Sequence, residues 1–204
     1  WKKTKFGYDG FGVKILKTPE DINTLPESEM IIEDLVSFEK ELSVIVARNS
    51  DKEVSCFETV EMEFNSDSNQ VEFVISPANI SEEVNNKAKE LAIKLAKSLD
   101  LVGVLAVEMF MSKDQILVNE IAPRPHNSGH FSIEACSSSQ YQQHLRAVFN
   151  MHLGNTKHKG CAIMINLVGE ENYSGKVYYE NIDSIFKVSS ANIHIYGKEE
   201  TRPN

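Results

Sequence analysis

The sequence contains few cysteines, and those that it has are widely separated. Cys56, Cys136 and Cys161 are the three among 204 residues, and no pair has the CxxC spacing of a redox or zinc site. An odd and scattered set also argues against the disulfide framework of a small secreted domain. We therefore expect buried, unpaired thiols in a reducing compartment and a cytoplasmic protein.

Long apolar runs and an excess of positive charge are also missing. No apolar run approaches the roughly 18 residues that a membrane-spanning helix needs, so we expect no membrane contact. The formal net charge of −9 argues against nucleic acid as a general partner, because surfaces that bind nucleic acid are basic. The remaining composition, 41% hydrophobic and 25% charged, is typical of a globular protein of one or two domains.

Residue patterns predict an α+β fold with one long helix. The helix is expected over residues 81–100, where Ser81 is a capping residue and apolar side chains recur at helical spacing. Two short helices are expected within residues 131–150. Strands are expected at residues 12–17, 30–36, 41–49, 53–65, 70–76, 103–111, 115–121, 161–169, 175–181, 185–189 and 192–197.

Residues 103–121 are predicted to form a hairpin that brings two acids together. With a turn near residues 112–115, residue 112 pairs with 116 and 110 with 118, so Glu108 lies opposite Glu120. Like charges directly opposite each other destabilise a strand pair, and a bound divalent cation would remove that conflict. Oxygen-only ligands favour Mg²⁺ or Mn²⁺. The alternative is a solvated acidic face, and a register slip of one residue would separate the pair.

The hairpin runs into an unusual stretch, VNEIAPRPHNSGH, at residues 118–130. Pro123 and Pro125 fix the backbone on either side of Arg124, whose guanidinium can bind a planar anion through two hydrogen bonds. His126 and His130 could bind a metal, but we favour hydrogen bonds to a substrate. The alternative is a surface arginine in a rigid loop.

A glycine-rich stretch, GYDGFG at residues 7–12, is the other candidate site. It is neither a Walker A loop nor a GxGxxG turn after a strand. Such a loop can still lay backbone N–H groups over phosphates, and Lys2, Lys3 and Lys5 precede it. The alternative is a tight hairpin turn.

Taken together, these segments resemble the ATP-grasp superfamily, and within it the 5-(carboxyamino)imidazole ribonucleotide synthases, the ATPase subunits of phosphoribosylaminoimidazole carboxylase. The resemblance runs nearly end to end, and NEIAPRPHNSGH is its most specific part. The segments that carry it are GYDGFG (7–12), IIEDLVSFEKELSV (31–44), VGVLAVEMF (102–110), VNEIAPRPHNSGH (118–130), QYQQHLRAV (140–148), AIMINLVG (162–169) and YGKEETRP (196–203).

The resemblance implies an ATP-grasp fold, an antiparallel sheet with flanking helices. Residues 1–31 would be the remainder of the lid, 32–155 the main subdomain, and 156–204 a small, truncated C-terminal β-rich subdomain. The family's N-terminal domain has no counterpart before Trp1, so we expect a fragment of a longer protein. The family also suggests a homodimer.

The resemblance further implies roles for individual residues. Glu108 and Glu120 would hold Mg²⁺ or Mn²⁺. The residues that would bind ATP are Lys2 (or Lys3), Gly7, Gly10, Glu33, Asp34, Leu35, Val36, Glu41, Asn119 and Glu120. Those that would bind the other substrates are Tyr8, Asp9, Arg124, His126, Asn127, Ser128 and Lys198. Asp9, Arg124 and Lys198 would be catalytic.

Some positions depart from the family pattern. Phe6 replaces a glycine, and Phe11 and Val13 replace a basic residue and a glutamine in the glycine-rich loop. Phe64 stands where the family often has a histidine close to the adenine.

The implied reaction is ATP-dependent carboxylation of aminoimidazole ribonucleotide by bicarbonate, through carboxyphosphate, in purine biosynthesis. Two alternatives stay open. One is a related ATP-grasp ligase, the formate-dependent glycinamide ribonucleotide transformylase, which shares a similar PRPH stretch. The other is a nucleotide-binding fragment without turnover.

Overall fold

The computed structural model describes residues 1–5, 12–64, 71–113, 115–170 and 172–201. The chain folds into two compact units, residues 1–165 and 166–204. The sequence places domain boundaries after residues 31 and 155, and these remain predictions. Residues 156–165 lie in the first unit, where they contribute a strand to its sheet. No helix within the described ranges is long and apolar enough to cross a membrane.

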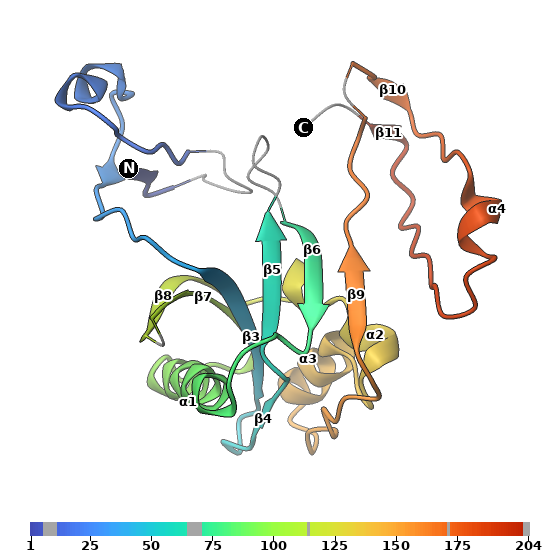
Figure 1. The fold of residues 1–204 in the computed structure, drawn as a ribbon. Coiled ribbons are helices and arrows are strands. Elements are labelled where there is room, and N and C mark those ends of the chain that lie inside the picture. Colours follow the sequence, from blue (N-terminus) through green and yellow to red (C-terminus); the bar gives the residue numbers. More distant parts are fainter. Residues whose placement is uncertain (6–11, 65–70, 114, 171, 202–204) are drawn as a thin grey trace. The chain divides into compact units, whose positions relative to one another are not determined.

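The first unit is built on a seven-stranded antiparallel sheet, drawn in Figure 1. The strand order is β8-β7-β3-β5-β6-β9, and β4 pairs with β3 off this path. The bounds are Lys40–Arg48 (β3), Val54–Cys56 (β4), Val60–Phe64 (β5), Val71–Ser76 (β6), Gly103–Ser112 (β7), Gln115–Ala122 (β8) and Ala162–Ile165 (β9). The predicted hairpin at residues 103–121 is confirmed as the pair β7 and β8, and the predicted strand at residues 53–65 divides into β4 and β5.

Helix α1, Glu82–Ser98, covers one face of this sheet (Figure 1). The Ser81 side chain accepts a hydrogen bond from the Val84 N–H, which satisfies one of the free donors at the helix start. The buried stripe of the helix is largely alanine, and small side chains let the helix lie close to the strands. It consists of Val84, Ala88, Ala92 and Ala96, and it packs against the even-numbered residues 42–46 of β3. The predicted long helix is therefore confirmed.

Two shorter helices lie against the opposite face. They are α2 (Ser132–Ala135) and α3 (Gln140–Val148), as the sequence predicted for residues 131–150. On this face β3 presents its odd-numbered residues, and Ile45 and Ala47 pack with Phe57, Ala106 and other apolar residues. The sheet therefore has an apolar core on each side.

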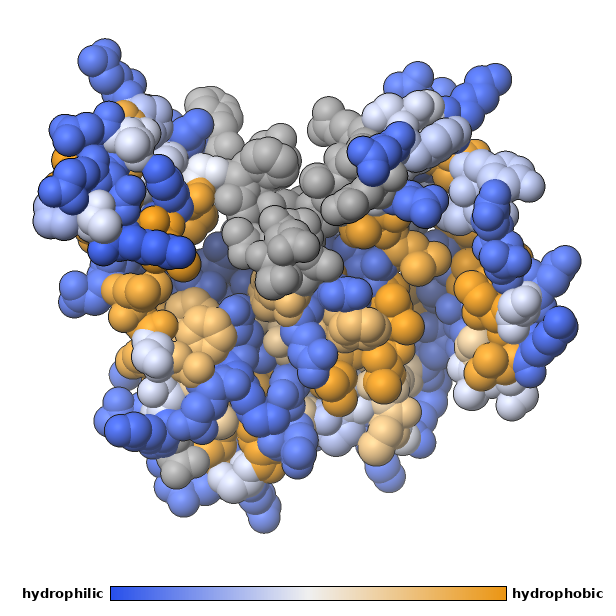
Figure 2. Space-filling model, turned by 45° about the horizontal axis from the view of Figure 1, so that its top comes forward, coloured by the Kyte–Doolittle hydropathy of each residue, from blue (hydrophilic) through white to orange (hydrophobic). Residues whose placement is uncertain are grey.

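The outer edge of the sheet is also partly apolar. The edge strand β9 exposes Ile163 to 64% and Ile165 to 56%. Figure 2 shows apolar side chains gathered over the β6–β9 part of the molecule. Cys161, just before this strand, is exposed, so the expectation of buried thiols is wrong for that residue.

The N-terminal segment differs from the sequence prediction. Strands β1 (Lys2–Lys3) and β2 (Met30–Ile31) pair with each other, and a 3-10 helix, η1, spans Pro19–Thr24. The strand predicted at residues 12–17 is reduced to a bridge between Val13 and Lys2. The strand predicted at 30–36 ends after Ile31, and Leu35 is 74% exposed. The prediction was wrong because an apolar run forms a buried strand only where its side chains are covered, and here Ile31, Ile32 and Leu35 are exposed.

The second unit contains little regular structure. Strands β10 (Gly175–Lys176) and β11 (Glu200–Thr201) pair, and a short helix, α4, spans Ile182–Ile185. The strand predicted at residues 185–189 is wrong, because this segment begins at the end of α4 and is otherwise irregular. The strand predicted at 192–197 is wrong as well. Alternating apolar residues in this unit stay largely exposed and therefore do not impose a sheet.

Candidate functional site

The β7–β8 hairpin places Glu108 directly opposite Glu120. The predicted pairing near the turn was wrong by one residue, because residue 112 pairs with 115 and 110 pairs with 117. A β-bulge at Asn119 then adds one residue to β8 and restores the predicted pair of glutamates. The two acids therefore lie opposite each other because of the bulge, and the alternation of residues in the sequence does not reveal the bulge.

The two glutamates lie on the sheet face that α1 does not cover. Glu108 pairs laterally with Ser43 of β3, and Glu41 lies two residues from Ser43 on the same face. Glu108 is only 7% exposed. Burial, followed by the negative charges of Glu120 and Glu41, raises the pKa of Glu108 to about 8. Burial and the charge of Glu120 raise the pKa of Glu41 to about 7.

This crowding of carboxylates fits a hard divalent cation. The positive charges of Arg124 and Lys2 oppose the rise in the pKa of Glu108, but their effects are smaller than those of burial and of the two neighbouring carboxylates. Carboxylate oxygens that face each other are donors that Mg²⁺ and Mn²⁺ prefer. Within the described ranges, no three His, Cys, Asp or Glu side chains form a cluster suited to a metal. Glu108 and Glu120 could supply two carboxylate ligands to such a cation.

Lys2 contacts two of the other predicted nucleotide-binding residues. Its ammonium donates a hydrogen bond to Asn119 Oδ1 at 2.9 Å and forms an ion pair with Glu33 Oε2 at 3.0 Å. The neighbouring Lys3 points to the other side of the strand, where its side chain lies against Gly12. Of the two lysines that the sequence left open, Lys2 is the one beside the carboxylates.

The loop after β8 folds back over the same face. His126 Nε2 lies 3.4 Å from Glu108 Oε1, and the Nδ1 of this ring lies 3.0 Å from Ser128 Oγ. Ser128 is fully buried, and its hydroxyl lies 2.8 Å from that of Ser43 on β3. A continuous row of polar contacts therefore links the loop to the sheet and to the carboxylate pair.

Arg124 and Asn127 complete the predicted anion-binding loop. Arg124 is exposed between Pro123 and Pro125, and its Nη1 donates to Pro125 O at 3.1 Å. Asn127 begins the short 3-10 helix η2, Asn127–Gly129. The guanidinium thus stays accessible, while the histidine and serine beyond it are held close to the sheet.

A cavity of about 380 Å³ opens beside Glu41. Its lining residues are Phe38, Glu39, Lys40, Glu41, Glu61, Met62, Glu63 and Phe64. The Phe38 ring stacks on Phe110, with centroids 4.4 Å apart. The predicted hinge residues 33–36 precede this cavity in an extended, largely exposed segment.

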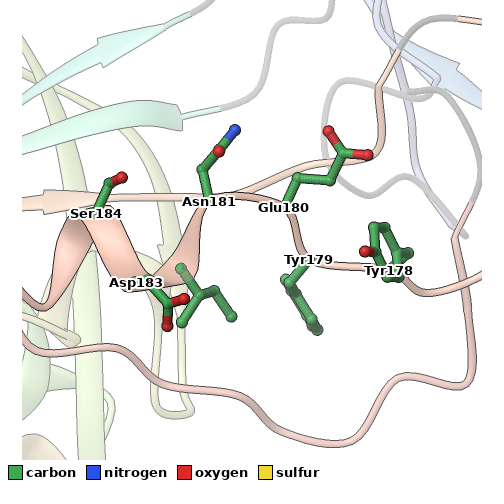
Figure 3. Close-up of a pocket in the computed structure, with 7 residues that line it drawn as sticks. Tyr178, Tyr179, Glu180, Asn181, Asp183 and Ser184 are labelled. Atoms are coloured by element: carbon green, nitrogen blue, oxygen red, sulfur yellow. The ribbon is translucent and has the colours of Figure 1, made fainter.

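Several predicted residues cannot be assembled into this site. Gly7, Tyr8, Asp9 and Gly10 lie outside the described residues. Lys198 belongs to the second unit, where its ammonium lies 5.8 Å from the centre of the Tyr196 ring. A second cavity, of about 570 Å³, is lined by residues 178–184 of that unit and contains no predicted site residue. Figure 3 shows its side chains along an irregular segment that leads into helix α4, with Asn181 and Tyr179 pointing to opposite sides.

Sequence reasoning missed two side chains that support the loop. Ser43 reads as an ordinary strand residue, and Gln140 as an ordinary helix residue. Both are fully buried, and Gln140 is hydrogen-bonded to the backbone of His126. The only signal in the sequence was that each of these two segments contains a polar residue at a position that proves to be buried. A pattern read residue by residue cannot tell such a residue from an exposed polar residue.

Two family profiles match the chain. The profile of the ATP-grasp domain matches residues 1–141. The profile of the phosphoribosylaminoimidazole carboxylase C-terminal domain matches residues 162–204. Together they match most of the first compact unit and all of the second, and residues 142–161 lie between them.

Individual relatives agree with these profiles. The N5-carboxyaminoimidazole ribonucleotide synthase of Bacillus subtilis is 42% identical over 207 residues, which cover 98% of this chain and 52% of that protein. The crystal structure of the corresponding synthetase from Thermotoga maritima superposes with a TM-score of 0.86 at 44% identity, covering 94% of this chain and 52% of the other.

An Aspergillus clavatus synthase was crystallised with ADP and 5-aminoimidazole ribonucleotide. It matches with a TM-score of 0.82 at 34% identity, over 91% of this chain and 49% of its own. The chain thus spans about half the length of these relatives.

Proposed function

Since the chain belongs to the N5-carboxyaminoimidazole ribonucleotide synthases of the ATP-grasp family, we propose that it carries the nucleotide- and bicarbonate-handling part of such an enzyme. The reaction would consume ATP, bicarbonate and 5-aminoimidazole ribonucleotide and yield ADP, phosphate and the N5-carboxylated ribonucleotide. The observation that carries the proposal is the pairing of Glu108 with Glu120, in which the buried Glu108 lies 3.4 Å from His126 of the loop that also carries Arg124.

The proposed position of ATP follows from the order of the polar groups. The adenosine would occupy the cavity beside Glu41, with the hinge residues 33–36 meeting the base and the Glu41 carboxylate meeting the ribose hydroxyls. Phe64, which lines the cavity, would offer an apolar contact where relatives offer a histidine. The phosphates would then lie toward Lys2 and the carboxylate pair, since Lys2 already contacts Asn119.

A divalent cation would be held by Glu108 and Glu120. When bound, it neutralises charge on the phosphates and so favours transfer of the terminal phosphoryl group. The chain's own contribution is to hold the two carboxylates opposite each other and to bring Lys2 next to them. Positioning and charge compensation account for most of the rate in such transfers.

The loop 123–130 would handle the small anion. In the proposed sequence, a bicarbonate oxygen attacks the terminal phosphorus of ATP, ADP leaves, and carboxyphosphate forms. The accessible Arg124 guanidinium can hold a planar carboxylate through two hydrogen bonds. His126, Asn127 and Ser128 would border the same anion, and the glycine-rich loop would cover it and exclude water.

The second half of the reaction forms a carbon–nitrogen bond. The exocyclic amine of the ribonucleotide attacks the carboxyl carbon, phosphate leaves, and the amine loses a proton. We assign Asp9 as the acceptor of that proton, Tyr8 to the ribonucleotide pocket, and Lys198 to its anionic groups. Asp9→Asn should therefore lower turnover without weakening ATP binding.

The test is substrate-dependent release of ADP by the longest natural chain that contains these residues. Release should require both bicarbonate and 5-aminoimidazole ribonucleotide, and the product should be acid-labile carboxylated ribonucleotide. Formate with glycinamide ribonucleotide is the matched control for the transformylase reaction and should give no release. Mg·ATP binding without any bicarbonate-dependent turnover would contradict the proposal and favour a nucleotide-binding module.

Assembly and location stay predictions. A homodimer is expected from the family, and sedimentation of the same chain tests it. A cytoplasmic location is expected from the cysteine pattern, and fractionation of cells tests that.

A further inference from the structure

Helix α3 carries two buried glutamines that use their side-chain amides in the same way. Gln140 Oε1 accepts the N–H of His126 at 2.9 Å, and its Nε2 donates to the carbonyl of His126 at 2.8 Å. Gln143 Oε1 accepts the N–H of Gly154 at 2.7 Å, and its Nε2 donates to the carbonyl of Gly154 at 2.7 Å. Both side chains are fully buried. Each glutamine thus satisfies both backbone groups of one loop residue, as a neighbouring strand would.

The loops that the two glutamines hold differ in content. The loop held by Gln140 contains His126, which lies 3.4 Å from Glu108, and Arg124 lies two residues before it. The loop held by Gln143, residues 150–157, contains no predicted site residue. The two helix positions therefore provide the same structural contact, once beneath the candidate site and once outside it.

The fit around Gln140 is close. A side chain at position 129 would collide with its amide, so the loop needs Gly129 there in order to lie against the helix. Gln140 Nε2 also lies 3.0 Å from His130 Nδ1. On the other side of the loop, the buried Ser128 hydroxyl contacts Ser43 of β3. The loop is thus held from the helix and from the sheet at once.

We propose that Gln140 is a positioning residue for the small anion, which acts by fixing the backbone of His126 and so the placement of the 124–128 segment over the carboxylate pair. This inference rests on the proposed function. Displacement of a binding group by about 1 Å can lower a rate by roughly 100-fold, even when the change lies outside the reacting groups. Gln143 has no such role and is the matched control.

The test compares Gln140→Met with Gln143→Met, because methionine keeps the volume and removes both hydrogen bonds. Both variants should lose several degrees of Tm, since each leaves two backbone groups unpaired. At a temperature where circular dichroism shows all chains folded, only Gln140→Met should lower kcat/KM for bicarbonate, by roughly 10- to 100-fold. The KM for ATP should stay within about twofold in both, because the adenosine cavity is untouched.

Equal losses of activity in both variants, or none in Gln140→Met, would overturn the assignment. Hydrogen exchange provides a readout that needs no turnover. The His126 amide hydrogen should exchange faster in Gln140→Met than in the wild-type chain, and it should exchange at the wild-type rate in Gln143→Met. If the wild-type chain shows no bicarbonate-dependent turnover, the proposed function fails, and the exchange comparison alone then decides whether Gln140 fixes the loop.

Discussion

The two faces of the central strands β3 and β7 are built for different purposes. On the α1 face, Leu42, Val44 and Val46 are buried beneath an alanine-rich helix, together with Leu105 and Val107. On the opposite face, apolar residues give way to Ser43, Glu41 and Glu108 within the same strands. The two faces belong to the same strands and so share the same backbone hydrogen bonds. They differ only in their side chains and in the elements that cover those side chains.

The difference shows how the chain separates stability from chemistry. A helix covers the apolar face and removes it from water, which stabilises the fold by about 25 cal/mol per Å² of apolar surface. A polar loop covers the charged half of the other face, where burial of Glu108 beside Glu120 opposes folding. Substitutions on the α1 face should therefore change mainly the free energy of unfolding, and substitutions among the charged residues of the opposite face should change mainly the activity.

Glu108→Gln should have the largest effect. The amide weakens the proposed cation site, and turnover should fall by roughly 100-fold or more. The free energy of unfolding should stay equal or rise, because the raised pKa of Glu108 makes folding at neutral pH require proton uptake by this carboxyl, and glutamine removes that requirement. Coupled measurement of ADP release and urea denaturation checks both, and Glu90→Gln on the exposed side of α1 is the control. Loss of stability together with activity would contradict the separation of the two faces.

Leu42→Ala tests the α1 face. Its side chain is fully buried in the apolar cluster beneath the helix, so truncation should lower the free energy of unfolding by about 3 kcal/mol. Activity per folded molecule should be almost unchanged. Urea denaturation measures the loss, and Leu99→Ala, at a half-exposed position, should cost under about 0.5 kcal/mol. A comparable loss for both leucines would show that α1 burial does not control stability.

Ser81→Ala sharpens the comparison at the start of the helix. The hydroxyl accepts the Val84 N–H, and its removal should lower the free energy of unfolding by about 1 kcal/mol. ADP release should not change, because the cap lies on the face without the carboxylates. An altered KM for ATP would mean that the helix and the site are coupled.

The smallest expected effect is on the pH dependence of stability, and it involves a histidine in the apolar half of the site face. Burial lowers the pKa of His158, which stacks on Phe131 and contacts Ser76, while the charge of Glu58 opposes the shift. Because the folded chain disfavours protonation, the unfolded chain binds more protons just below pH 6.5, and stability should fall as the pH falls through this range. His158→Gln should flatten this part of the pH profile of urea denaturation, and an unchanged profile would contradict the assignment.

Local patterns predicted a large part of the fold and of the site. Helix α1 was predictable because Ser81, the acidic first turn and the apolar spacing act within the helix itself. The β7–β8 hairpin was predictable from alternation. The Glu108–Glu120 pair was predicted correctly, although the assumed register near the turn was wrong and the bulge corrected it.

Features set by tertiary contacts could not be predicted. In α3, Tyr141, Leu145 and Val148 recur at helical spacing and would be assigned to the core, yet they are exposed. Gln140 and Gln143 are buried instead, because each finds both backbone partners on a distant loop. A glutamine can form these two hydrogen bonds only after folding has brought the loop next to it. The sequence around the glutamine does not indicate that the loop will lie there.

The single extra residue in β8 has a consequence for how this hairpin can change. Before Asn119 the odd-numbered residues of β8 share the face of Glu108, and after it the even-numbered ones do. The bulge therefore reverses, between the tip of the hairpin and its base, whether odd- or even-numbered residues of β8 share the face of Glu108. Deleting Asn119 would leave a regular strand, in which Val118 still pairs with Met109 and Glu120 still pairs with Glu108. The deletion would remove the side chain that accepts a hydrogen bond from Lys2, but it would keep the tip and Glu120 on their present faces. A change in turn length beyond the bulge likewise leaves the carboxylates in step with β7.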